Sequence, residues 1–374
     1  MKEGLGTKAT EQTKNQNRPN IMNTIHATLH SFMKSKSSLR ARALVGSIAA
    51  LLAVPAAQAA VVNWDGDTSV AWSNAANWNA LPTDDLFTDI ANFNQATYGF
   101  APDAGMTSIN GITIGASNGP MTLTTTSLSI GTGGITIANL AGALTVAGGV
   151  TIGGIQSWAN NSSTALTTGG ILAIDNQLSL TAGTFALGNF ANTGAGGVVI
   201  NGATAQAGND AAFGTGTLTL TSGTVSSDGG TARSFANALA INGSVTLGDA
   251  TNNGALAFTG GTTITGSNTI TLAGSGGATF STAAMSLADG SNTTFSSASG
   301  ALTLSGGFNT NTGTKTLTFD TGANAVTMSG ALTGSGTLVL AGSGTNVTVG
   351  ALTTTANAIQ VNSTTDNSSS RLFQ

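Results

Sequence analysis

The feature that most constrains this chain is a short pattern that recurs from about residue 105 to residue 361. Two apolar residues are separated by one residue, and a turn-forming stretch follows. Residues 211–258 show the pattern most plainly, with triplets at Leu218–Leu220, Leu239–Ile241, Val245–Leu247 and Leu256–Phe258. Short alternating runs between turn residues predict strands, and their regular recurrence predicts a repeat architecture. We therefore predict an all-β fold, a parallel β-helix (β-solenoid).

The triplet has a direct structural meaning because side chains alternate across a strand. Its two apolar residues point into the core, and the middle residue, often Thr, points out, where its β-branch fits the pleat and its hydroxyl meets water. Gly and Asn supply the backbone conformations of tight corners. Three such strands make a coil of about 20–25 residues, and about eleven coils would stack about 4.8 Å apart. A β-sandwich is the competing fold, although it does not need so many similar short strands, and the Gly and Thr density excludes helix for most of the region.

Charge divides the chain into two parts. Residues 1–59 hold eight of the eleven Lys and Arg residues, whereas from Ala60 onward three basic residues stand against thirteen Asp, a formal charge of −10. This second part has no Glu, His or Cys. Without a basic patch to neutralise phosphates, we predict no nucleic-acid partner. The lack of Cys fits a secreted bacterial protein that needs no disulfides.

Residues 34–59 carry the three parts of a secretory signal peptide. Four basic residues precede an apolar run at 43–54, and the segment ends in Ala57-Gln58-Ala59. We predict a disordered or helical leader over 1–59, cleavage after Ala59 and export through the inner membrane. The run is too short for a permanent membrane span, so a buried helix is the alternative. Met1, Met22 and Met33 are candidate start sites, and the ordinary length of signal peptides favours Met33.

Residues 60–104 differ from the repeat that follows them. They contain Trp64, Trp72 and Trp78, three of the four tryptophans of the chain. A solenoid needs an atypical terminal unit because a bare apolar end cannot face water, and large aromatic side chains suit that task. We therefore predict an N-terminal cap at 60–104, a β-solenoid at 105–361 and a polar tail at 362–374. The alternative is an exposed indole platform that stacks on sugars.

Aspartates of the same segment raise two further interpretations. A glycosidase needs two carboxylates that face each other across the scissile bond, whereas adjacent strand residues such as Asp84 and Asp85 point to opposite faces. A calcium loop needs oxygen ligands at alternate positions, and Asp65 and Asp67 supply only the start of that pattern. Solvated turn aspartates are the simpler interpretation, for Asp89 as well. We therefore predict no catalytic residue, no metal site and no cofactor.

Several runs resemble the autotransporter-associated β-strand repeats of large bacterial surface and secreted proteins. These runs are Gly214–Leu220, Gly223-Thr224, Asp228–Gly230 and Gly248-Asp249, preceded by an opening with Trp64, Gly66, Trp72, Trp78, Pro82, Asp89, Ala91 and Phe93. The resemblance covers about residues 61–350 and implies a right-handed parallel β-helix passenger exported to the cell surface or beyond, with no catalytic residues to transfer. The polar end at 362–374 departs from the family pattern, which leaves a truncated passenger or a released protein as alternatives.

These observations predict an exported structural β-solenoid without catalytic activity, a passenger stalk or adhesin-like protein of the bacterial cell surface or extracellular space. Surface polysaccharide or other matrix components are the expected partners, no membrane span is expected after the leader, and the oligomeric state stays open. If the chain is adhesive, we expect ligand contacts at Trp64, Trp72, Trp78 and Trp158. The loop Asn160–Thr164, which interrupts the triplet rhythm beside Trp158, belongs to the same expectation.

Two other functions compete with this interpretation. A carbohydrate-active β-helix enzyme would have to work with Asp residues, because the chain from Ala60 onward lacks His, Glu and Cys, three of the residue types that perform acid–base catalysis. A binder of ice or another crystal surface would use outward Thr residues aligned on one face. Candidates for such an array are Thr122/Thr124, Thr217/Thr219/Thr221, Thr263/Thr265, Thr269/Thr271 and Thr316/Thr318.

Overall fold

A computed structural model gives the fold of most of the chain from Ala59 onward. It describes residues 59–103, 107–188, 190–281, 285–287, 292–297, 299–310, 315–341, 346–352 and 358–361. The predicted leader, its signal peptide and the polar tail lie outside the described residues.

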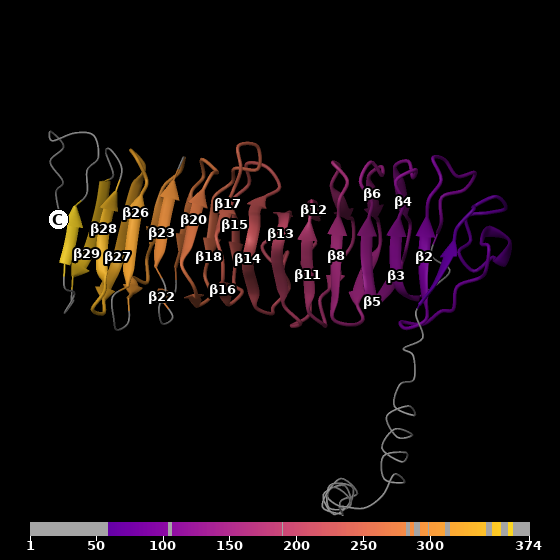
Figure 1. The fold of residues 1–374 in the computed structure, drawn as a ribbon, viewed down its shortest axis with the longest axis horizontal. Coiled ribbons are helices and arrows are strands. Elements are labelled where there is room, and N and C mark those ends of the chain that lie inside the picture. The colour runs from indigo at the N-terminus through magenta and orange to yellow at the C-terminus, as the bar shows by residue number, and fades with distance from the viewer. Residues whose placement is uncertain are drawn as a thin grey trace, which may run out of the picture. The chain divides into compact units, whose positions relative to one another are not determined.

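The described residues form a three-sided parallel β-solenoid of about eleven coils, as predicted. Every pairing between its strands is parallel, and most strands pair with the equivalent strands of the coils before and after them. Figure 1 shows the coils following one another in chain order along one axis, from indigo at β2 to yellow at β29. One helical element is described, a single 3₁₀ turn, η1 (Ala75–Asn77).

Three faces run along the solenoid, and several long strands turn a corner and contribute to two of them. The first face consists of β1 (Ala60–Asn63), β2 (Asp89–Phe93), β8 (Gln156–Asn160), β11 (Leu178–Ala182), β16 (Leu239–Ile241), β19 (Thr262–Ile264), β22 (Met285–Leu287) and β25 (Phe308–Asn309). The second face consists of β4 (Met121–Leu123), β6 (Leu144–Val146), β9 (Leu166–Thr168), β12 (Thr184–Leu187), β17 (Val245–Leu247), β20 (Asn268–Leu272), β23 (Thr293–Ser297), β26 (Thr316–Asp320), β28 (Thr337–Ala341) and β30 (Ala358–Val361).

The third face consists of β7 (Gly149–Ile152), β10 (Leu172–Ala173), β15 (Arg233–Phe235), β18 (Leu256–Phe258), β21 (Ala278–Phe280) and β24 (Leu302–Leu304). The strands that span two faces are β3 (Ser108–Ile114), β5 (Ser127–Ile137), β13 (Val198–Ala207), β14 (Leu218–Ser227), β27 (Ala325–Thr333) and β29 (Asn346–Leu352). Most of them shift register at the corner, as β3 does between Ile109 and Gly111.

The register confirms the predicted coil length. Val198 pairs with Leu218, 20 residues further on, and Val245 pairs with Ile270, 25 residues further on. The first coil is longer, because Ala60 pairs with Asp89. It accommodates the tryptophan-rich segment.

Apolar residues of the triplets fill the interior, as the alternation predicts. In β16 and β18 the first and last side chains are buried and the middle Ala is partly exposed. Equivalent positions stack from coil to coil, so like side chains meet: the rings of Phe235 and Phe258 lie 5.5 Å apart and those of Phe258 and Phe280 lie 5.2 Å apart. Burial of such rings and their mutual packing supply much of the stabilising energy of the core.

The N-terminal end of this core is covered by the first coil. Trp64, Trp72 and Trp78 are at most 5% exposed, and their rings pack on one another and on Phe93 of β2. The indole nitrogen of Trp78 donates a hydrogen bond of 2.7 Å to the backbone oxygen of Trp72. Burial of all three indoles is what a terminal unit that shields a solenoid requires. Among the described residues, no helix has the length and hydropathy to cross a membrane.

We predict that Phe258→Ala lowers the free energy of unfolding by about 3–5 kcal/mol, because it removes a fully buried ring from the middle of the stack. The matched control is Phe87→Ala, which truncates a ring that is 76% exposed and should change stability by at most about 0.5 kcal/mol. Denaturant unfolding of the two variants measures both values. Equal losses from the two substitutions would contradict the stacked core.

Candidate functional site

The four tryptophans predicted as ligand contacts all lie in the interior. Trp64, Trp72 and Trp158 are at most 1% exposed, and Trp78 is 5% exposed. Trp158 occupies an inward position of β8, where its indole nitrogen donates to the side-chain oxygen of Gln156 at 2.8 Å. The structure therefore corrects this expectation: none of these indoles presents a face on which a ligand can stack.

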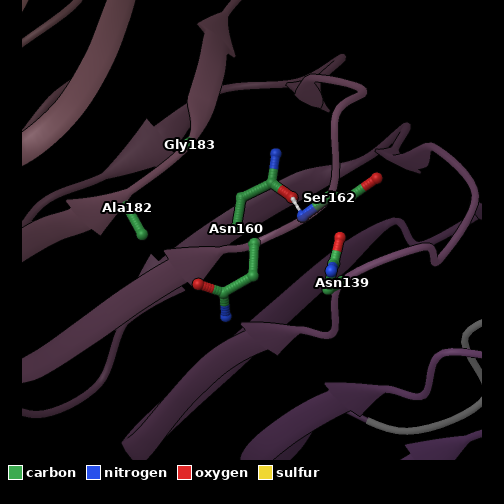
Figure 2. A pocket seen from close by; sticks show the side chains of 6 residues that line it. Asn139, Asn160, Ser162, Ala182 and Gly183 are labelled. Carbon is green, nitrogen blue, oxygen red and sulfur yellow. Dashed lines mark hydrogen bonds between the residues drawn. The ribbon is translucent and has the colours of Figure 1, made fainter.

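A polar groove lies instead beside the loop that follows Trp158. It opens at the corner between the first and second faces and extends over three consecutive coils (Figure 2). Its volume is about 600 Å³, and it is shallow and open to solvent. We call it the corner groove, and its lining residues are Asn139, Asn160, Asn161, Ser162, Ala182 and Gly183.

Unequal corner lengths create this groove. The corner between β5 and β6 takes residues 138–143, the next one, between β8 and β9, takes residues 161–165, and the third is Gly183 alone. Two projecting loops are thus followed by a tight turn. Gly183 has a φ of 69°, and a Cβ there would collide with the backbone oxygen of Asn160, so only glycine fits this corner.

Buried hydrogen bonds hold the middle loop in place. The side chain of Asn160 is fully buried and donates to the backbone oxygens of Thr164 and Thr184, at 2.7 and 2.9 Å. Its own oxygen accepts from the backbone N–H of Ser162 at 3.1 Å. The Ser162 hydroxyl donates to the backbone oxygen of Ala141, on the preceding corner, at 2.6 Å. The groove is therefore built from a loop tied to both neighbouring coils, rather than from freely moving side chains.

Two amide side chains of the groove face solvent, those of Asn139 and Asn161. Asn161 donates to the backbone oxygen of Ile137 at 3.2 Å, and Asn139 makes no side-chain hydrogen bond within the described residues. None of the lining residues carries a charge. The groove can therefore donate and accept hydrogen bonds, but its own side chains offer no group that transfers a proton near neutral pH.

Leu140, the residue that follows Asn139, has an unusual conformation. Its φ is 68°, a left-handed value that no other non-glycine residue of the described ranges adopts. For a leucine this conformation costs about 1–2 kcal/mol, because its Cβ crowds the backbone. The side chain is 82% exposed, so the strain is not offset by burial.

The aspartates that were considered for catalysis or calcium binding, Asp84, Asp85 and Asp89, accept hydrogen bonds that anchor loops. Asp84 accepts hydrogen bonds from the backbone N–H and the hydroxyl of Ser108, at 2.7 and 2.8 Å, and so ties the first coil to β3. Asp85 accepts from the backbone N–H groups of Phe87 and Thr88 within its own turn. The Asp89 carboxylate accepts from the backbone N–H of Thr83 at 2.7 Å. Within the described part of the chain, no three His, Cys, Asp or Glu residues gather in a group able to hold a metal ion.

The same contacts set the acidity of Asp84 and Asp85. Desolvation favours the protonated form of Asp84, but hydrogen bonds from Ser108 and Thr107 together outweigh it and lower the pKa of the carboxyl. Backbone hydrogen bonds from Phe87 and Thr88 lower the pKa of Asp85. Both groups are thus kept ionised, whereas a general acid at neutral pH needs a raised pKa.

Outward threonines do align, although the pairs predicted from the sequence divide among faces. Thr269 pairs in register with Thr294 and then with Thr318 on the second face, whereas Thr263 lies on the first. A longer row, not among the predicted pairs, runs along the third face at Thr279, Thr303, Thr327 and Thr348. Thr is a favoured outward strand residue, so the row by itself identifies no ligand.

Comparison of the chain with known protein families, with curated proteins and with solved structures found no match. The resemblance to autotransporter-associated repeats therefore stays a prediction from the sequence.

Sequence reasoning named the loop Asn160–Thr164 but missed the rest of the groove. Asn139 precedes Gly183 by 44 positions in the sequence, so these residues meet only when three coils stack. The signal that could have found them is the spacing between triplets, which is wide after Ile137 and narrow after Leu180.

We predict that acid weakens the attachment of the first coil through Asp84. Its folded-state pKa is lowered, so its contribution to stability is complete above the unfolded-state value of about 4 and is lost as the pH falls through the folded-state value. The Asp84→Asn variant should have a free energy of unfolding lower by about 1 kcal/mol at pH 7, which is the value for an ionic hydrogen bond discounted for exposure. Its free energy of unfolding should also depend less on pH between about 5 and 2.

Thermal unfolding of both proteins across that range measures the effect. Asp67→Asn is the control, because it makes the same charge change on an exposed aspartate of the same coil. If the melting temperature of the Asp84→Asn variant falls with pH as that of the wild type does, Asp84 does not anchor this coil.

Proposed function

We propose that the chain is an exported structural β-solenoid, displayed at the bacterial cell surface or released outside the cell, where it serves as a passenger stalk or adhesin-like protein without catalytic activity. The observation that carries the proposal is the parallel stack itself, in which each described strand is paired with equivalent strands of its neighbours. Such a stack provides length and surface from small repeated units.

Export is supported by the agreement between the sequence and the start of the fold. The predicted cleavage site follows Ala59, and β1, the first strand of the described residues, begins at Ala60. Coils that are small, low in charge and free of Cys suit passage across a membrane in the unfolded state. Because each coil contacts mainly its neighbours, folding can then propagate along the stack from any coil that has formed.

A non-catalytic role is supported by how polar groups are used. Asp84, Asp85 and Asp89 accept hydrogen bonds that shape loops, and the corner groove is lined by amides, one hydroxyl and small residues. These are means of holding structure and of binding. The groove and the projecting corners around it are the surface that we assign to contacts with surface polysaccharide or other matrix components.

Cell fractionation combined with intact-mass analysis tests the export proposal. We expect the protein in the surface or medium fraction with an N-terminus at Ala60. The Ala57→Asp/Ala59→Asp variant, which disrupts the small-residue cleavage motif, should keep its leader and remain cell-associated. Protein that stays in the cytoplasm and retains the 43–54 segment in the wild type would overturn the proposal.

A further inference from the structure

We propose that the corner groove is a binding site for neutral carbohydrate, with Asn139 and Asn161 as contact residues inside the groove and Leu140, the exposed residue that follows Asn139 in the chain, as an apolar contact beside it. The inference deepens the proposed function and rests on it, since an exported solenoid meets the glycans of cell surfaces and matrices. This one corner combines an uncharged lining, free hydrogen-bonding capacity, a rigid loop and a strained residue.

The absence of charged side chains from the groove favours an uncharged ligand. No side chain of the groove is ionisable, so it offers neither a counter-ion for an anion nor a carboxylate for a cation. The surrounding chain from Ala60 onward has a formal charge of −10, and its field disfavours anionic ligands further. A ligand of this groove is therefore neutral and polar.

Hydrogen-bonding capacity then favours a polyhydroxyl compound. An amide side chain carries an acceptor oxygen and an NH₂ donor side by side, and a pair of neighbouring sugar hydroxyls can both accept and donate. Asn139 and Asn161 project such amides into solvent from adjacent coils. Both residues line the same groove, so one sugar, or neighbouring sugars in a chain, can contact both amides.

Rigidity makes the groove a prepared surface. Asn160 and Ser162 tie the loop to the coils on both sides, so little ordering is left to occur when a ligand binds. Ala182 and Gly183 form one side of the groove without large side chains, which lets a ring approach the backbone closely. Figure 2 shows Asn139 and Ser162 on one side of the groove and Ala182 and Gly183 on the other.

Strain at Leu140 is the second, independent observation. The residue keeps a left-handed backbone and a solvent-exposed apolar side chain directly after Asn139. Strained conformations that bring no packing in return are characteristic of functional positions. Beside two amides, an exposed leucine can pack against the apolar C–H face of a sugar ring.

A neutral peptide is the competing ligand, and the topology disfavours it. Peptides commonly bind by adding a strand to a free sheet edge or by placing apolar side chains in a groove. Here β8 is already paired with β5 on one side and β11 on the other. The lining of the groove is polar or small, and Leu140 beside it is a single exposed side chain, so there is no enclosed apolar pocket for a peptide side chain.

Binding of the full chain to an array of immobilised neutral oligosaccharides, with uronic-acid oligosaccharides and neutral peptides beside them, tests the proposal. We expect binding to at least one neutral oligosaccharide. The Asn139→Ala/Asn161→Ala variant should bind it at least about tenfold more weakly, because two ligand hydrogen bonds are lost. The control is Asn201→Ala/Asn242→Ala, two exposed amides of the same corner in later coils, which should bind as the wild type does.

Leu140→Gly separates function from folding. Glycine relieves the strain, so the melting temperature should rise while oligosaccharide binding falls. Binding to peptides or uronic acids in place of neutral sugars, undiminished binding by the double variant, or no binding at all would each overturn the proposal. Each of these outcomes leaves export intact, because export is scored separately by the location and N-terminus of the protein.

Discussion

Parallel backbone pairing between successive coils is the interaction on which the rest of the structure depends. It brings residues 20–25 positions apart into register, as Leu218 with Leu239 and Val245 with Ile270. Because the register is maintained, like side chains stack in the core, and Phe235, Phe258 and Phe280 form a continuous row. A single coil could not bury these rings, so the fold is stable only as a stack, and its end needs the indole cover formed by Trp64, Trp72 and Trp78.

The same constraint leaves the corners free to vary, and variation at the corners is where this chain acquires a distinctive surface. Strands must keep their alternation, whereas a corner can hold six residues after Ile137 or a single glycine at 183. The short corner costs only a local register shift, between Leu180 and Ala182, and the strands on both sides of it stay paired. The corner groove results from that difference. Its polar lining is fixed by bonds from Asn160 and Ser162 to adjacent coils, so the stack also determines the rigidity of the site.

Much of the fold follows from the sequence because alternation is a local property. The triplet Leu239-Ala240-Ile241 specifies its own buried and exposed positions, and the structure confirms them. The same rule places Trp158 inside, two residues from the buried Gln156 on β8, although the indole was expected to contact ligand. The proximity of Asn139 and Gly183 could not be predicted from the sequence, because it depends on the lengths of three coils. The φ of Leu140 is likewise set by its corner and by no local signal.

Hydrogen–deuterium exchange along the full chain tests the stacked solenoid most directly, since amides in inter-coil pairs are protected and corner amides are not. The account predicts slow exchange in short segments that recur three to a coil every 20–25 residues, such as Leu239–Ile241, Val245–Leu247 and Leu256–Phe258, with faster exchange at the corners between them. Uniformly fast exchange from residue 107 to residue 341, or protection in long unbroken blocks, would contradict it.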